Sequence, residues 1–267
     1  MKCKICASDS HKIFEKTILQ KYNTAYYQCS NCSFVQTDEP HWLKEAYESA
    51  ITSLDIGLAG RNITLRGEIK EIIDSCFPET SIYLDYAGGY GMFVRLMRDI
   101  GYDFFRQDDY CENIFANYFD IKDIKTSKFD IVTAFEVLEH FNNPLEEIAK
   151  VFEYADTVIF STELLPKSSS KIENWWYITE ETGQHIAFYS DKAMQLIAKK
   201  FNKNYYRRNH NIHVFTSKTL QQPQIDFAFR KRHKKILGYK IEKINQAIQR
   251  ESLTQVDYEY IKSILNK

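Results

Sequence analysis

Residues 81–91 read SIYLDYAGGYG and decide the fold. Strand-forming side chains precede Asp85, three glycines follow it, and a helical pattern begins at Met92. A strand that passes through a glycine-rich turn into a helix lets the backbone approach a ligand at the carboxyl edge of a parallel sheet. The segment therefore predicts a ligand-binding turn in an α/β domain.

The residues around this turn predict a ligand that contains adenosine. Val94 stands where a third small residue would complete the G-x-G-x-x-G pattern, which argues against a nicotinamide dinucleotide. Asp108, with Asp109 beside it, ends the strand pattern that follows the one ending at Asp85. An acid at that place accepts hydrogen bonds from ribose hydroxyls. An ordinary turn aspartate is the alternative, and the preceding loop favours the ribose role.

Further out, apolar segments and helical patterns alternate as a parallel sheet requires. A final pair of short strands around residues 209–211 (NHN) predicts an antiparallel hairpin. The helices are expected at 61–76, 92–100, 144–154 and 191–201, the last capped by Ser190, and the strands at 81–85, 102–106, 129–135, 156–161, 204–208 and 212–217.

Four of the six cysteines form two close pairs, Cys3-x-x-Cys6 and Cys29-x-x-Cys32. Two such pairs can complete a tetrahedral thiolate site, and a hairpin built from residues 13–14 and 24–27 would bring them together. A redox dithiol needs a βαβ context that this segment lacks, so we favour a structural zinc. His11 is a possible ligand, but four thiolates already close the site.

Length and composition allow one α/β domain and small additions. We expect a zinc-binding module over 1–40, a catalytic domain over 41–220 and a basic helical tail over 221–267. The net charge of −1 gives no global field toward nucleic acid or membranes, which points to a small-molecule partner. No apolar run approaches the roughly 18 residues of a membrane span, and the N-terminus has no secretory h-region, so a cytoplasmic location is expected.

Residues 85–91 resemble the D-x-G-x-G-x-G motif of class I S-adenosylmethionine-dependent methyltransferases, with Ala87 replacing the first glycine and expected to keep a negative φ. Residues 129–140 (FDIVTAFEVLEH) and the following Asn143-Pro144 are similar to a second segment of that family. The resemblance implies a Rossmann-like, seven-stranded sheet and S-adenosylmethionine as cofactor. The implied cofactor-binding residues are Asp85, Ala87, Gly88, Gly89, Gly91, Asp108, Asp109, Phe135 and Glu136. Glu139 and His140 either join the site or serve as helix-capping and surface residues.

The long connection over 161–190 points to the acceptor, because long loops in compact domains are usually functional. Its aromatic residues 175–177 (WWY) suit either a lid or a hydrophobic plug. Residues 184–190 (QHIAFYS) resemble a segment of sugar methyltransferases that carry a four-cysteine zinc module, and the resemblance implies His185 as the catalytic base. Gln184 replaces that family's glutamate, so O-methylation is as plausible as C-methylation.

The resemblance covers residues 1 to about 217 and implies a methyltransferase acting on a sugar nucleotide or related phosphorylated precursor of capsule or cell-surface polysaccharide. Glu139 and His140 are the further candidate catalytic residues. The basic run 230–235 is either a solvated face or a phosphate grip. The alternatives are a nucleic-acid methyltransferase with zinc knuckles and a non-catalytic binding protein. Residues 135–138 (FEVL) lack the motif of amino-methylating enzymes, which argues against the first.

Overall fold

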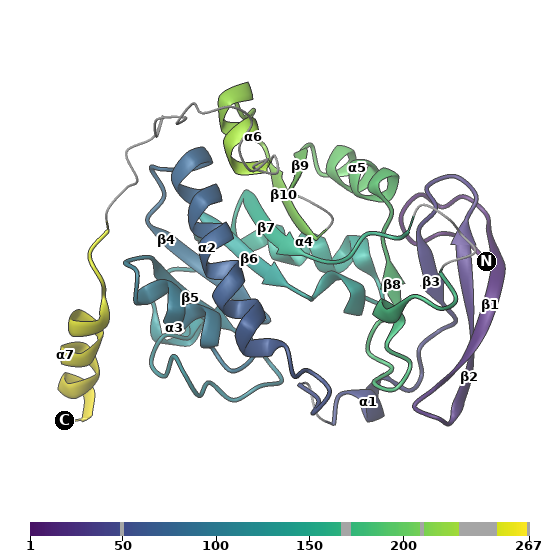
Figure 1. Ribbon diagram of the computed structural model, residues 1–267, viewed down its shortest axis with the longest axis horizontal. Coiled ribbons are helices and arrows are strands. Elements are labelled where there is room, and N and C mark those ends of the chain that lie inside the picture. The colour runs from purple at the N-terminus through teal and green to yellow at the C-terminus, as the bar shows by residue number, and fades with distance from the viewer. Residues whose placement is uncertain (49–50, 167–171, 209–210, 230–249, 266–267) are drawn as a thin grey trace, which may run out of the picture.

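A twisted six-stranded sheet forms the centre of the computed structural model (Figure 1). The structure describes residues 1–48, 51–166, 172–208, 211–229 and 250–265. The strand order of the sheet is β5-β4-β6-β7-β10-β9. The first four strands run parallel, and β10 pairs antiparallel with both β7 and β9. The bounds are β4 (Ile82–Tyr86), β5 (Asp103–Gln107), β6 (Ile131–Phe135), β7 (Thr157–Ser161), β9 (Asn204–Arg208) and β10 (Ile212–Thr216).

Helices cover both faces of this sheet, as expected for a Rossmann-like fold. In Figure 1, α2 crosses in front of the strands and α4 lies behind them. α2 also contacts α3 and α6, while α5 packs beside β9. The bounds are α2 (Leu58–Cys76), α3 (Met92–Arg98), α4 (Pro144–Tyr154), α5 (Asp191–Lys200) and α6 (Gln222–Phe229).

The sheet has six strands among the described residues, so the expectation of seven is corrected. Beyond β5, the chain makes a single parallel bridge between Arg106 and Asp120. Asp120 then caps the short helix η1 (Ile121–Asp123), which ends the extended conformation after that bridge. The position that a seventh strand would occupy at this edge is therefore held by a loop with one bridge.

The expected N-terminal hairpin is confirmed, and it belongs to a second, smaller sheet of order β1-β2-β3-β8. β1 (Ser10–Ile18) pairs antiparallel with β2 (Tyr22–Cys29), and β3 (Val35–Thr37) follows. The fourth strand, β8 (Ala187–Phe188), comes from the long connection after β7. The small sheet is thus completed by a strand that comes much later in the sequence, after four of the six strands of the central sheet.

The expected helices and strands are present, with ends shifted by a few residues. Ser190 caps α5 as predicted, because its Oγ accepts a hydrogen bond from the Ala193 N–H at 3.0 Å. The hairpin between β9 and β10 is confirmed by its register, although residues 209–210 of its turn lie outside the described residues. Within the described part of the chain, no helix is both long and apolar enough to span a membrane.

The C-terminal helix α7 (Thr254–Leu265) docks against α3 through buried charges. Asp257 is 2 % exposed and lies 2.7 Å from Arg98 Nη2 and 2.9 Å from Arg95 Nη1. Leu253 N–H also donates to the Arg98 carbonyl. The helical tail is thereby tied to the central domain, while the basic run 230–235 lies outside the described residues.

Candidate functional site

The glycine-rich turn after β4 forms the predicted cofactor edge. Gly91 has φ +82° at the N-cap of α3, and a Cβ there would lie 2.6 Å from Asn113 Oδ1. A Cβ on Gly88 would lie 2.8 Å from Asp85 Oδ2, so the turn has no room for a side chain at either position. Ala87 has φ +53°, which corrects the expected negative value. The turn imposes the left-handed conformation on Ala87 at a cost of about 1–2 kcal/mol.

Asp85 lies near the end of β4 beneath this turn and is 3 % exposed. Its Oδ1 accepts a hydrogen bond from Thr133 Oγ1 at 2.6 Å, which fixes the carboxyl between β4 and β6. Burial raises the pKa of the Asp85 carboxyl to about 7. A buried carboxyl at this point can interact with the polar end of a ligand that lies along the glycine-rich turn.

Asp108 joins the end of β5 to the glycine-rich turn. One carboxylate oxygen accepts from Gly89 N–H at 2.8 Å, and the other accepts from the N–H groups of Tyr110 and Cys111 at 2.8 and 2.7 Å. Carboxylate oxygens have further lone pairs, so ribose hydroxyls can still be accepted. Asp109 is exposed beside it.

Glu136 follows β6 and faces the same edge. Glu136 adopts a positive φ in the left-handed region, and strained backbone of this kind is concentrated at functional sites. Ser161 Oγ, at the end of β7, accepts from Glu136 N–H and donates to Glu136 Oε1 at 2.6 Å. Phe135 is half-buried and meets the Phe93 ring edge-to-face. Two predicted cofactor residues, the last residue of β6 and the one that follows it, therefore lie at one sheet edge with Asp85.

Tyr177 links two carboxyl groups next to this edge. Its hydroxyl lies 2.9 Å from Glu136 Oε2 and 2.5 Å from Glu139 Oε1. One hydroxyl hydrogen cannot serve two carboxylates, so one carboxyl must itself be protonated. Burial, together with the charge of Glu136, raises the pKa of the Glu139 carboxyl well above its usual value. This raised pKa favours the protonated form of Glu139.

His140 and His185 complete a cluster with Glu139. His185 Nε2 lies 4.0 Å from Glu139 Oε1, and the two imidazole rings meet edge-to-face at 4.9 Å. His185 Nδ1 donates to the Tyr177 carbonyl at 2.6 Å, so its Nε2 carries the lone pair. Burial lowers the pKa of both imidazoles, which keeps them neutral near pH 7. The structure thus brings together the three predicted catalytic residues.

Gln184 has a structural role in the segment that carries His185. Its side-chain amide donates to the Ala46 carbonyl at 2.8 Å. Trp42 Nε1 donates to the neighbouring Gly183 carbonyl at 2.8 Å. These contacts anchor the segment to residues around the short helix α1 (Leu43–Ala46). Gln184 therefore positions the chain near His185.

A family model described as a methyltransferase domain matches residues 61–222, which is more than half of the chain. The chain belongs to this family. Its fold is that of a class I S-adenosylmethionine-dependent methyltransferase. No curated protein sequence matches this methyltransferase.

Several solved methyltransferase structures are similar in fold to this methyltransferase. The plantazolicin methyltransferase BpumL, solved with S-adenosylhomocysteine, is 12 % identical, with a TM-score of 0.43 over 66 % of this chain and 94 % of its own. An O-methyltransferase family 2 protein from Planctomyces limnophilus DSM 3776 is 12 % identical, with a TM-score of 0.46 over 64 % of each chain. The magnesium protoporphyrin IX methyltransferase of Synechocystis PCC 6803 is 12 % identical, with a TM-score of 0.39 over 66 % of this chain and 94 % of its own.

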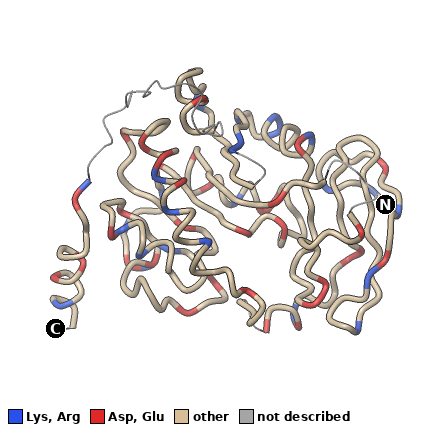
Figure 2. The backbone as a smooth tube through the Cα atoms, viewed as in Figure 1, with Lys and Arg blue, Asp and Glu red and all other residues tan. Residues whose placement is uncertain are grey.

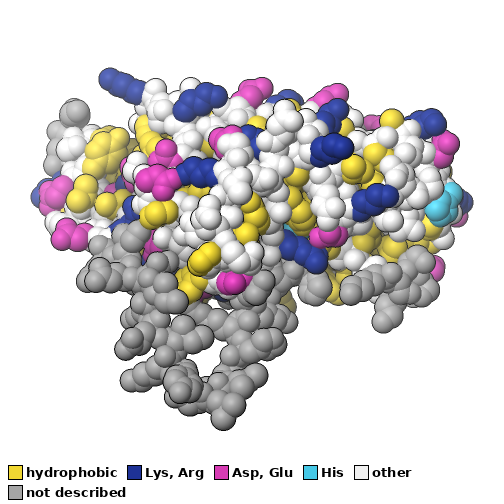
Figure 3. Space-filling view, turned by 90° about the horizontal axis from the view of Figure 1, so that it is seen from above, with side chains coloured by type: hydrophobic (Ala, Val, Ile, Leu, Met, Phe, Trp, Pro, Cys, Tyr) yellow, Lys and Arg dark blue, Asp and Glu magenta, His cyan; other side chains and the backbone are white. Residues whose placement is uncertain are grey.

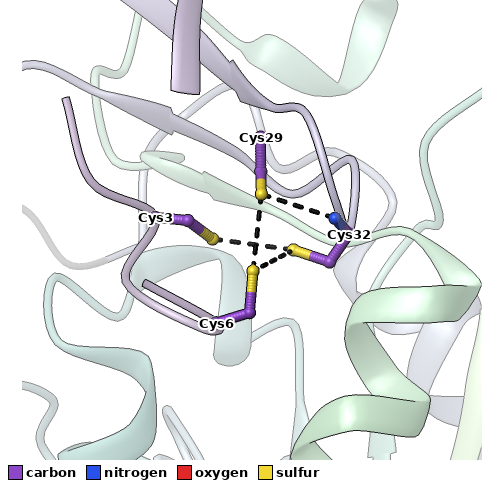
Figure 4. A group of neighbouring side chains, drawn as sticks. All are labelled: Cys3, Cys6, Cys29 and Cys32. Atoms are coloured by element: carbon purple, nitrogen blue, oxygen red, sulfur yellow. Dashed lines mark hydrogen bonds between the residues drawn. The ribbon is translucent and has the colours of Figure 1, made fainter. Parts of the chain in front are cut away.

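The four cysteines beside the methyltransferase's small sheet converge on one point (Figure 4). Neighbouring sulfurs lie 3.5–3.6 Å apart, which is much longer than a disulfide bond. Backbone N–H groups point at two of the sulfurs: Ile5 N–H at Cys3, and Asn31 and Cys32 N–H at Cys29. His11 is exposed and lies outside this group.

Sequence reasoning missed two residues that organise the methyltransferase site. Arg106 lies under the glycine-rich turn, donating to the carbonyls of Gly89 and Cys111 while its Nε bonds to Asp120 at 2.6 Å. Nothing in the local pattern marks this arginine, since it occupies an ordinary strand position. Tyr177 was noted only as one aromatic of the lid or plug. It is buried, whereas Trp176 beside it is 71 % exposed.

Proposed function

We propose that this methyltransferase moves the methyl group of S-adenosylmethionine to a hydroxyl of a sugar nucleotide or a related phosphorylated sugar. The observation that carries the proposal is the lone pair of His185 Nε2, which faces Glu139 in a cluster joined through Tyr177 to Glu136 at the cofactor edge. A methyl acceptor and the cofactor would therefore meet at one place.

The cofactor assignment follows from the glycine-rich turn after β4 and from the acidic residues at the end of β5. Asp108, with Asp109 beside it, would hold the ribose hydroxyls, and the glycine-rich turn would lie along the methionine part. Phe135 and Glu136, at the end of β6, would line the side of the cofactor opposite Asp108. In this orientation, the sulfonium methyl group would lie toward the cluster that contains His185.

The acceptor must lose a proton as its oxygen attacks the methyl carbon. In a site without a bound cation, His185 Nε2 is the candidate proton acceptor, because Nδ1 is already engaged as a donor. Gln184 brings no carboxylate, but Glu139 approaches the imidazole from a different segment. A carbon next to a ketone is the alternative acceptor.

The sugar-phosphate assignment rests on the resemblance of residues 184–190 and of the cysteine pairs to sugar methyltransferases. Charge distribution supports a small acceptor. Figure 2 shows acidic and basic residues interspersed along the chain, and the face visible in Figure 3 mixes both signs. A nucleic-acid substrate would favour a broad basic surface.

We also propose that Cys3, Cys6, Cys29 and Cys32 hold one structural zinc ion. Four thiolates bound tetrahedrally to zinc are in contact with one another around the ion, and the sulfur separations of 3.5–3.6 Å found here suit that arrangement. Four thiolates leave no position open for substrate. The zinc would stabilise the small sheet and take no part in methyl transfer.

Replacing His185 by glutamine is expected to reduce kcat by about 10²–10⁴-fold, because the side chain loses its acid–base function. The affinity for S-adenosylhomocysteine should change little, since His185 is assigned to the acceptor side of the site. Methyl transfer to a panel of sugar nucleotides, alongside calorimetric binding, measures both. His41→Gln, at an exposed position, is the matched control. Wild-type turnover by His185→Gln would refute its assigned role.

A further inference from the structure

We propose that Glu139, His140 and His185 bind a divalent transition-metal cation, which activates the acceptor hydroxyl. Each residue offers one ligand atom, and the three atoms lie within 4.8 Å of one another. One carboxylate and two imidazoles form a ligand set that binds metals while leaving coordination positions open. This inference rests on the proposed function, and it names what would activate the acceptor at that same site.

The separations fit a cation after small side-chain movements. Opposite ligands of a six-coordinate ion lie two bond lengths apart, and metal–nitrogen or metal–oxygen bonds are about 2.0–2.2 Å long. The gap of 4.0 Å between His185 Nε2 and Glu139 Oε1 is close to this span. Glu139 and His140 are adjacent in η2 (Leu138–His140), so only His185 comes from a distant segment.

A second observation points independently to a ligand. Glu139 is fully buried, and its Oε2 has no hydrogen-bond partner among the described residues. Leaving a buried acceptor unsatisfied is costly, and more so when it is charged. Buried carboxylates in proteins are normally paired or coordinate metals. A cation would supply positive charge beside two carboxyl groups that share one tyrosine hydroxyl.

The surroundings of the two histidines also suit metal ligands. A ligating histidine usually donates its other ring N–H to a carbonyl or carboxylate. His185 does so, because its Nδ1 donates to the Tyr177 carbonyl. His140 Nδ1 lies 2.8 Å from the Tyr47 hydroxyl, which can accept its hydrogen and leave Nε2 for the metal. Both rings are therefore held by hydrogen bonds on one nitrogen.

The donor set favours Mn²⁺, Fe²⁺, Co²⁺ or Zn²⁺ over Ca²⁺ and Mg²⁺, since two of its three atoms are imidazole nitrogens. Three protein ligands leave positions for an acceptor, and two neighbouring sugar hydroxyls would occupy them as a chelate. The preferred substrate class is therefore a sugar with a vicinal diol. In the metal-loaded site, His185 is a ligand, and this replaces its role as proton acceptor.

Metal binding lowers the pKa of a coordinated hydroxyl, as it does for water. The hydroxyl proton passes to solvent, and an oxygen lone pair forms the new bond to the methyl carbon. The carbon–sulfur bond breaks and its electron pair stays on sulfur. The products are a methyl ether, S-adenosylhomocysteine and one proton, so atoms and charge balance.

Manganese titration of protein that holds one zinc per chain, in the cysteine site, tests the inference when it is followed by the electron paramagnetic resonance signal of free Mn²⁺. Mn²⁺ is a poor competitor for thiolates, so the cysteine site retains its zinc. We expect one Mn²⁺ per wild-type chain and an affinity at least tenfold lower in Glu139→Gln and His185→Gln. His41→Gln is the control that should bind as the wild type does. Circular dichroism melting verifies that each variant is folded.

Absence of Mn²⁺ binding by the wild-type protein, or equal binding by Glu139→Gln, would overturn the metal site. Calorimetry with S-adenosylhomocysteine on the same samples separates this failure from failure of the proposed function. If the protein binds the cofactor and transfers methyl groups but does not bind metal, only the metal site is refuted. If it does not bind the cofactor, the proposed function and the metal site are both refuted. Faster methylation of a vicinal diol than of its monodeoxy analogue, only when Mn²⁺ is present, supports chelation.

Discussion

Replacing Cys29 by serine is expected to abolish methyl transfer, although this cysteine lies outside the catalytic cluster. Structural zinc supplies about 10–16 kcal/mol of apparent binding free energy to small cysteine modules, and the small sheet would lose its organisation without it. That sheet includes β8, which begins at Ala187, close to His185. Ile186 itself bonds to Thr37 N–H through its carbonyl and to the Glu139 carbonyl through its N–H.

Further contacts tie the cysteine turns to the same segment. Ser190 Oγ donates to the Cys32 carbonyl at 2.5 Å, and Lys192 Nζ donates to the Asn31 carbonyl at 2.6 Å. Disorder of the cysteine turns would therefore displace His185 from Glu139. We expect turnover to fall by more than about 10²-fold, as is typical when a reacting group is misplaced by about 1 Å.

Metal analysis, methyl-transfer assays and calorimetry with S-adenosylhomocysteine provide the measurement. The expected result is less than one zinc per chain, no turnover and retained cofactor binding, because the cofactor edge belongs to the central sheet. Cys76→Ala is the control, since its thiol is buried in α2, away from the cluster. Normal turnover by a zinc-free Cys29→Ser chain would show that the cysteine site does not position His185.

Asp257→Ala is expected to lower the free energy of unfolding by about 3–5 kcal/mol, the range found when one partner of a buried ion pair is removed. The side chain of Asp257 is 3 % exposed and that of Arg98 is 6 % exposed. Two guanidinium groups converge on this carboxylate, since Arg95 also bonds to it. Removing the carboxylate would leave Arg98 buried with Asp103 as its remaining acidic partner.

Urea unfolding followed by circular dichroism measures this effect. Glu259→Ala, at an exposed position on α7, is the control and should leave the free energy of unfolding close to that of the wild type. A similarly small change for Asp257→Ala would mean that α7 does not dock on α3 in solution. Loss of stability with intact cofactor affinity per folded molecule would show that the C-terminal helix stabilises the domain without lining the site.

Local patterns predicted most of the central fold. The helix at Pro144–Tyr154 was located to the residue, because Pro144 marks the first turn and an apolar stripe follows it. The strands next to the glycine-rich turn were found with small shifts at their ends. These features depend on neighbours in the sequence, so periodicity and turn residues reveal them.

Features that depend on long-range contacts could not be predicted from the sequence. β8 is too short to show any period, and it exists because residues 187–188 pair with 35–36 of β3. The seventh strand was expected from a resemblance, but the chain after Arg106 turns away at Asp120. The φ of Ala87 was misjudged because the turn, and not the intrinsic preference of alanine, decides it.

The candidate site was predicted in its parts and not in its arrangement. Glu139, His140 and His185 were each proposed from motifs, but His185 belongs to a segment far along the chain from the other two. Their contact depends on Tyr177, whose backbone carbonyl orients His185 and whose hydroxyl bonds to Glu139. An aromatic run in a long loop gave only a weak signal for that role. The catalytic and cofactor roles of these residues stay predictions until the variants are measured.

The most direct test of the account is calorimetric titration of the purified protein with S-adenosylhomocysteine. We predict one binding site per chain with micromolar affinity, and loss of most of that affinity in Asp108→Ala, which removes both the ribose contact and the bond to Gly89 N–H. Asp109→Ala, at the exposed neighbouring position, should be affected less. Absence of binding by the folded wild-type protein would contradict the assignment of the glycine-rich turn as a cofactor site.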